Sequence, residues 1–119
     1  MYHSDFSVIS MPTTAAPPYP FDTRAAALRD CATIQESTFG GSPREWSSLT
    51  HLNTTLAADS SYAVVYQLSD GTGEWHVRAG ARRGCLSVEA SRASSPSEAQ
   101  ATADGLDTFF GKVFSNAGL

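Results

Sequence analysis

The chain has 119 residues, of which 41% are hydrophobic and 17% are charged, and its formal net charge is −4. This length favours a single domain with a core large enough to fold by itself. The negative balance argues against tight non-specific binding of nucleic acid by the whole surface, because phosphates require an excess of Lys and Arg. No apolar run reaches transmembrane length and no secretory leader pattern is present, so we expect an intracellular protein without a membrane contact.

Residues 1–20 form the first distinct segment. They lack a sustained hydrophobic period and end in a cluster of prolines. This composition is typical of an extended, flexible arm. We therefore expect an arm over residues 1–20 and a single domain over residues 21–119.

Two helices are predicted after the arm. Asp22 is a suitable N-cap for a helix that runs to about Ser37, before a Phe-Gly-Gly stretch. The next stretch, Ser42 to Glu45, reads Ser-Pro-Arg-Glu and has the form of a capping box. Apolar residues follow it at three- and four-residue steps, which predicts a second helix ending near Ala58. These residues are Trp46, Leu49, Leu52 and Leu56.

A period of two residues then predicts three strands. Apolar and polar residues alternate over residues 62–68, 75–79 and 85–91, with turn residues at 70–73 and 80–84. In the second and third strands, one face is apolar and the other polar. This pattern is typical of an antiparallel meander that has helices on one side and water on the other.

The last predicted element is a helix. Its start, Ser95 to Glu98, reads Ser-Pro-Ser-Glu and repeats the earlier capping signal. Asp104 and Asp107 are expected to face solvent. An apolar stripe follows at helical spacing, formed by Ala99, Ala103, Leu106, Phe110 and Val113 and widened by Phe109 and Phe114. The predicted fold is therefore α+β in the order α-α-β-β-β-α, with a three-stranded antiparallel meander backed by helices on one face.

Residues 44–114 resemble the double-stranded-RNA-binding domain. The shared features are a Leu-Asn pair before the strands, a tyrosine in the first strand and a Ser-x-x-x-Ala frame at the last helix. They correspond here to Leu52, Asn53, Tyr62, Ser95, Ala99 and Ala103. The resemblance implies an α-β-β-β-α fold, but uncharged residues occupy the positions of the family's three phosphate-binding lysines, namely Pro96, Ser97 and Gln100. It thus implies a degenerate member, and such members serve dimerisation or protein docking.

Motifs for catalysis or metal binding are not recognised in the sequence. It contains no Gly-x-Ser-x-Gly nucleophile elbow and no phosphate-binding loop of the required spacing. The spacings of Cys31, His51, His76 and Cys85 match no zinc pattern, and a bridge between the two cysteines is left open. We expect no catalytic residues, no metal and no cofactor.

Three functions stay open at this point. The first is a non-catalytic interaction or assembly module that binds a protein partner or a second copy of itself. Its candidate interface is Phe109, Phe110 and Phe114, unless these residues belong to the core. The second is an RNA-binding protein that uses a basic patch formed by His76, Arg78, Arg82, Arg83 and Arg92. The third is a small enzyme whose catalytic residues are dispersed along the chain.

Overall fold

The computed structural model describes residues 4–10, 19–30, 34–36, 44–68 and 73–119. These residues form strands and helices in the order β1 (Ser4–Ser10), α1 (Pro20–Asp30), β2 (Ile34–Glu36), β3 (Arg44–His51), β4 (Ser60–Leu68), β5 (Trp75–Arg83), β6 (Leu86–Ala93), a short 3₁₀ turn (Pro96–Glu98) and α2 (Ala99–Asn116).

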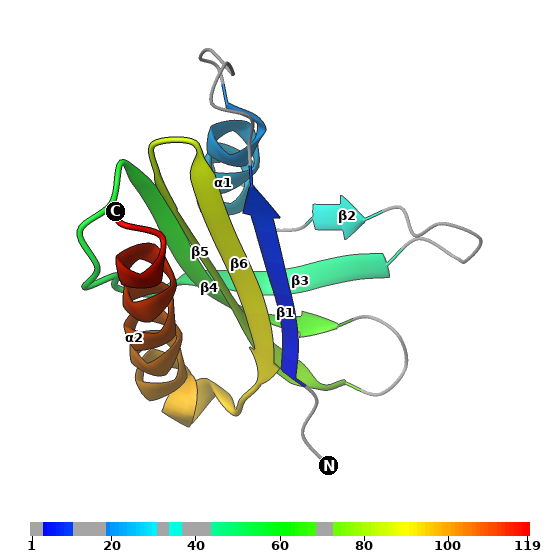
Figure 1. Cartoon of the computed structure of the whole chain (residues 1–119). Helices are drawn as coiled ribbons and strands as arrows, with labels where there is room; N and C mark the ends of the chain where they lie inside the picture. The colour runs from blue at the N-terminus through cyan, green and yellow to red at the C-terminus, as the bar shows by residue number, and fades with distance from the viewer. Residues whose placement is uncertain (1–3, 11–18, 31–33, 37–43, 69–72) are drawn as a thin grey trace.

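The strands form one antiparallel sheet in the order β1-β6-β5-β4-β3-β2 (Figure 1). Its centre is the meander β4-β5-β6, which the alternation of apolar and polar residues predicted. The turn between β5 and β6 is two residues long and begins at Gly84, whose φ of 57° is a left-handed conformation that favours glycine. The α+β class is confirmed.

The two helices lie on opposite faces of the sheet. Alternate residues of β4 point to opposite faces, and Val64 belongs to the cluster beneath α1 whereas Ala63 and Val65 belong to the cluster beneath α2. The sequence predicted that all helices cover one face of the sheet, because every second residue of the meander is polar and such a face is typically open to water. That polar face instead carries α1.

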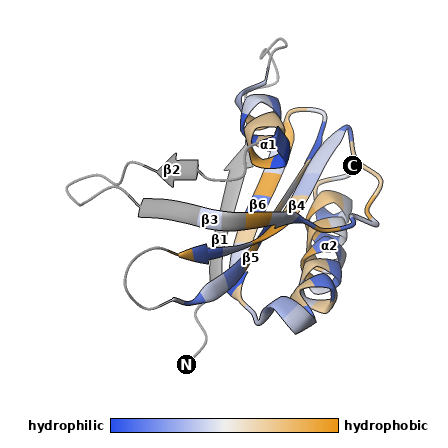
Figure 2. Ribbon diagram, turned by 180° about the vertical axis from the view of Figure 1, so that it is seen from behind, coloured by the Kyte–Doolittle hydropathy of each residue, from blue (hydrophilic) through white to orange (hydrophobic). Residues whose placement is uncertain are grey.

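The α2 face holds the larger apolar core. Phe110 and Phe114 are fully buried on the helix, and they pack over a sheet face whose residues are small or β-branched. Figure 2 shows the apolar side of α2 turned toward the sheet. Full burial of each phenylalanine contributes about 1.5–3 kcal/mol. The sheet residues of this cluster are Ala63, Val65, Val77, Ala79, Ala81, Val88 and Ala90.

The loop between β3 and β4 is fastened to α2 by a buried carboxylate. Asp107 is 5% exposed and accepts hydrogen bonds from the Thr55 backbone N (2.9 Å) and the Thr55 hydroxyl (3.3 Å). The expectation that Asp107 faces solvent was therefore wrong, whereas Asp104 is exposed. A buried carboxylate needs such partners because an unsatisfied one is strongly destabilising.

The predicted second helix is replaced by β3 and the loop that follows it. Residues 44–51 are a strand paired with β4, and residues 52–59 contain no helix. The capping signal at Ser42 and Pro43 begins outside the described residues. Five of the residues from 47 to 55 are Ser or Thr, which favour helices weakly, so the pairing with β4 overrides a local start signal.

Three other predicted boundaries also differ. The first helix spans Pro20–Asp30, and the predicted end of that helix includes residues 34–36, which form β2. Residues 80–83, predicted to be a turn, continue β5. Residues 4–10 of the predicted arm form β1, which pairs with β6 along its whole length. The rest of the arm before residue 19 lies outside the described residues.

Candidate functional site

A buried ion-pair network occupies the sheet face beneath α1. Glu89 is 3% exposed and stands at its centre. Arg24 of α1 reaches the Glu89 carboxylate with Nε (3.2 Å) and Nη2 (3.3 Å), and Arg78 of β5 reaches it with Nη2 (3.4 Å). The Tyr62 hydroxyl donates to Glu89 Oε1 at 3.1 Å and accepts from Arg78 Nε at 3.1 Å. Two guanidinium groups and one phenol therefore satisfy a single buried carboxylate.

The network changes how its members titrate. Burial raises the pKa of Tyr62 above the ordinary tyrosine value, and the Glu89 carboxylate adds to this effect while Arg78 opposes it. For Arg78, burial favours the neutral form, but Tyr62 and Glu89 outweigh it and raise its pKa. Arg78 is thus a fixed cation whose charge is balanced within the fold.

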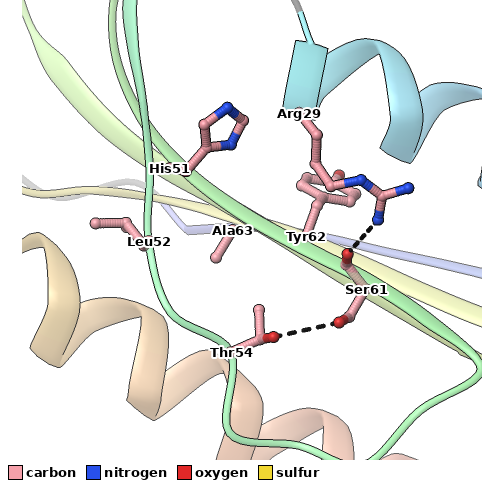
Figure 3. A pocket seen from close by; sticks show the side chains of 7 residues that line it. All are labelled: Arg29, His51, Leu52, Thr54, Ser61, Tyr62 and Ala63. Carbon is pink, nitrogen blue, oxygen red and sulfur yellow. Dashed lines mark hydrogen bonds between the residues drawn. The ribbon is translucent and has the colours of Figure 1, made fainter.

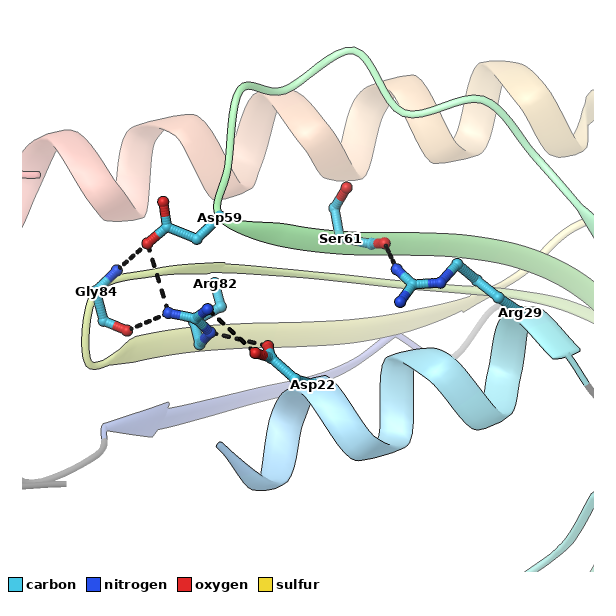
Figure 4. A network of polar contacts seen from close by, with 6 residues as sticks. All are labelled: Asp22, Arg29, Asp59, Ser61, Arg82 and Gly84. Carbon is cyan, nitrogen blue, oxygen red and sulfur yellow. Dashed lines mark hydrogen bonds and ion pairs between the residues drawn. The ribbon is translucent and has the colours of Figure 1, made fainter. Parts of the chain in front are cut away.

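Arg82 joins three parts of the molecule (Figure 4). Its guanidinium donates to both carboxylate oxygens of Asp22 on α1, at 2.9 and 3.2 Å, and to Asp59 Oδ2 at 3.4 Å before β4. It also donates to the Gly84 carbonyl at 2.8 Å, in the turn after β5. The hydrogen bond to Asp22 raises the pKa of Arg82, and the Tyr19 ring lies 4.1 Å from the guanidinium carbon. Arg82 is only 8% exposed.

The other residues of the predicted basic patch lie apart. His76 contacts Glu74 at 3.3 Å and stacks on the Tyr66 ring, with centroids 5.9 Å apart. Arg83 lies over the Phe114 ring on the α2 side and donates to the carbonyls of Ala57 and Leu119. Arg92 is exposed on β6. The five residues therefore do not form one surface, since Arg82 contacts α1 and Arg83 contacts α2.

The predicted phenylalanine interface lies largely in the core. Phe110 and Phe114 are 0% exposed, and Phe109 is partly buried against the same cluster. The alternative that these residues are core holds for Phe110 and Phe114. They offer a partner no surface.

A pocket of about 330 Å³ opens between α1 and the β3–β4 region (Figure 3). Arg29 lies on the α1 side and His51 on the β3 side, and the Thr54 and Ser61 hydroxyls bond to each other at 3.3 Å. The remaining lining residues are Leu52, Tyr62 and Ala63. Sequence reasoning missed this pocket because its residues come from three separate segments and share no motif.

The two edges of the sheet differ in length and regularity. β1 is seven residues long and pairs with β6 in an unbroken register, from Ser4 opposite Arg92 to Ser10 opposite Leu86. At the other edge, β2 covers only residues 44–46 of β3. The register of β3 then shifts between Ser47 and Thr50, which marks a bulge or irregularity.

Comparison with protein-family models, curated proteins and solved structures gives no match to this chain. The resemblance to the double-stranded-RNA-binding domain stays a prediction. None of the described helices is long and apolar enough to cross a membrane. Among the residues that the structure describes, no three or more His, Cys, Asp or Glu side chains gather as a metal site would require.

Proposed function

We propose that the chain is a non-catalytic protein-interaction module that joins a second copy of itself through the open edge of β1. The observation that carries this proposal is the contrast between the two edges. No strand in the described part of the chain pairs with the outer side of β1, and its register with β6 has no break. An edge of this kind presents a row of main-chain donors and acceptors to another strand.

The composition of β1 supports this role. Its sequence, SDFSVIS, contains one charge, no lysine and no proline. Natural proteins usually protect an edge strand with lysines, prolines, bulges or a short length. The opposite edge has two of these protections, because β2 has three residues and β3 has a register shift. β1 has neither.

The sequence of β1 is also suited to pairing with itself. In an antiparallel pair centred on Ser7, Phe6 faces Val8 of the second copy, and Ser4 faces Ser10. Asp5 faces Ile9, so no like charges meet across the pair. The two-fold symmetry would join two sheets into one continuous sheet, as in an isologous dimer.

The arginines support an RNA-binding role less well. The charges of Arg78 and Arg82 are balanced in place by Glu89, Asp22 and Asp59. Binding of phosphates by these two residues would take a guanidinium partner from each of these carboxylates. These ion pairs therefore disfavour RNA binding through Arg78 and Arg82.

Sedimentation velocity over a concentration series tests the proposal. We expect a reversible monomer–dimer equilibrium, together with a rise in amide-exchange protection in β1 at high concentration. Amides of β2 and β3 should keep the same protection, because their edge is not used. A chain that stays monomeric up to its solubility limit would overturn the proposal.

A matched pair of variants then tests the register. Ser4→Glu/Ser10→Glu places like charges opposite each other twice, and should weaken the dimer by about tenfold at low ionic strength. Ser4→Glu/Ser10→Lys alters the same positions but places opposite charges together, so it should dimerise at least as well as the wild type. Equal dimerisation of the two variants would exclude this two-fold pairing.

A further inference from the structure

We infer that the pocket between α1 and β4 is a binding site for a small carboxylate with an apolar body. This inference does not depend on the β1 edge, because none of the pocket residues belongs to β1. It rests on the charge of Arg29, the position of its guanidinium beside Ser61 and the partly exposed side chain of Leu52 (Figure 3).

Arg29 gives the lining a fixed positive charge, and the described lining residues include no acid to balance it. Arg29 and His51 are both exposed, and none of the described lining residues is Asp or Glu. The two arginines of the Glu89 network differ in this respect, because Arg24 and Arg78 both contact Glu89. Arg29 is therefore suited to bind a carboxylate from outside the chain.

The guanidinium of Arg29 is held in place at the mouth of the pocket. Its Nη1 donates to the Ser61 carbonyl at 2.9 Å, and this hydrogen bond tethers one side of the group to β4. A guanidinium has five N–H donors in a rigid fork that matches a carboxylate. The pocket also lies near the C-terminal end of α1, where the helix dipole is negative. The full charge of Arg29 is thus needed to attract an anion there.

The rest of the lining favours an apolar body. Leu52 is partly buried and contributes aliphatic surface, whereas Ala63 is only 3% exposed, and the Tyr62 hydroxyl is already bonded to Glu89 and Arg78. The Thr54 and Ser61 hydroxyls are bonded to each other, so they compete weakly for a ligand. A volume of about 330 Å³ lies at the lower end of the range for small-molecule pockets. The fitting ligand class is a small aromatic or branched aliphatic carboxylate.

Titration with benzoate, followed by two-dimensional amide and side-chain NMR, tests this inference. We expect saturable shifts at Leu52, Thr54 and Ala63. Benzamide has nearly the same shape but lacks the charge, and should bind about tenfold or more weakly. Inorganic phosphate serves as an anion without an apolar body and should also bind more weakly than benzoate. Equal binding of benzoate and benzamide, or no saturable shift with benzoate, would overturn the inference.

Variants of Arg29 separate charge from geometry. Arg29→Gln should weaken benzoate binding by about tenfold or more. Arg29→Lys should retain part of the affinity, because it keeps the charge and loses the fork. The matched control is Arg92→Gln, which removes the same charge from an exposed position outside the pocket and should leave binding unchanged.

His51→Gln provides an independent variant if an Arg29 variant perturbs the fold. His51 is exposed and should be replaceable without loss of structure, while benzoate affinity should fall. Unchanged benzoate affinity in both Arg29→Gln and His51→Gln would show that benzoate binds outside this pocket. Dispersed amide spectra verify that each variant is folded.

Discussion

The two faces of the sheet are held to their helices by different forces. Beneath α2, Phe110 and Phe114 pack on alanines and valines, and the contact is apolar throughout its centre. Beneath α1, the apolar cluster is smaller, and Glu89 and Arg82 add paired charges around it. Apolar burial is not directional, whereas a buried charge pair requires all of its partners. The α1 face should therefore respond to changes of pH and salt more than the apolar centre of the α2 face does.

The largest effect is expected from removing a phenylalanine beneath α2. Phe110→Ala leaves a cavity at a fully buried position and should lower the free energy of unfolding by about 3–5 kcal/mol. The loss should be nearly independent of salt concentration. Urea denaturation at two salt concentrations measures both quantities. A strongly salt-dependent loss would contradict the apolar character of this face.

The next effect is expected from the carboxylate beneath α1. Glu89→Ala leaves Arg24 and Arg78 without their common partner and should lower the free energy of unfolding by about 3 kcal/mol. This loss is at the low end of the range for breaking a buried ion pair, because the Arg24 side chain is 40% exposed and can be solvated. Hydrogen exchange should show faster exchange in α1 than in α2. The exposed Glu98 offers a control, since Glu98→Ala should change neither quantity appreciably.

The smallest effect is expected from one hydroxyl of the same network. Tyr62→Phe removes two hydrogen bonds and should lower the free energy of unfolding by roughly 1–2 kcal/mol at neutral pH. The pKa of Tyr62 is raised in the folded state, above the value of about 10 that holds in an unfolded chain. The unfolded state therefore loses this proton first, and wild-type stability should fall as the pH rises above about 10.

Urea denaturation between about pH 9 and pH 11 checks this pH dependence. The stability of Tyr62→Phe should fall less steeply over that interval, so the two curves should approach each other. Parallel curves would mean that ionisation of Tyr62 does not contribute to the pH dependence of the free energy of unfolding.

The sequence predicted the elements whose signals are local. The alternation in residues 62–91 predicted the meander, and the apolar stripe from Ala99 predicted α2, because each pattern extends over many residues. It failed for β3, where a capping signal and four spaced apolar residues mimic a helix. No local sequence pattern indicates that residues 44–51 pair with β4. The sequence also could not predict the charge network, because residues such as Arg82 and Asp22 lie 60 residues apart in the chain.

The candidate sites illustrate the same limit. Arg78 and Arg82 stand out in the sequence as part of a basic cluster, but a count of charges cannot reveal that the carboxylates of Glu89 and Asp22 face them. Phe110 fits both a core stripe and an interface, and only the position of the sheet decides between them. The pocket is lined by residues from three segments that are distant in the sequence, so no pattern within one segment predicts it.

The pairing of β1 with β6 has a consequence for biosynthesis. Val8 pairs with Val88, so β1 leaves the ribosome well before the strand with which it pairs. At typical elongation rates of roughly 5–20 residues per second, this delay lasts about 4–16 s. During that time the Phe6–Ile9 segment has not yet met β6 and is available to chaperones or neighbouring nascent chains. β1 therefore depends on protection during translation until β6 has been synthesised.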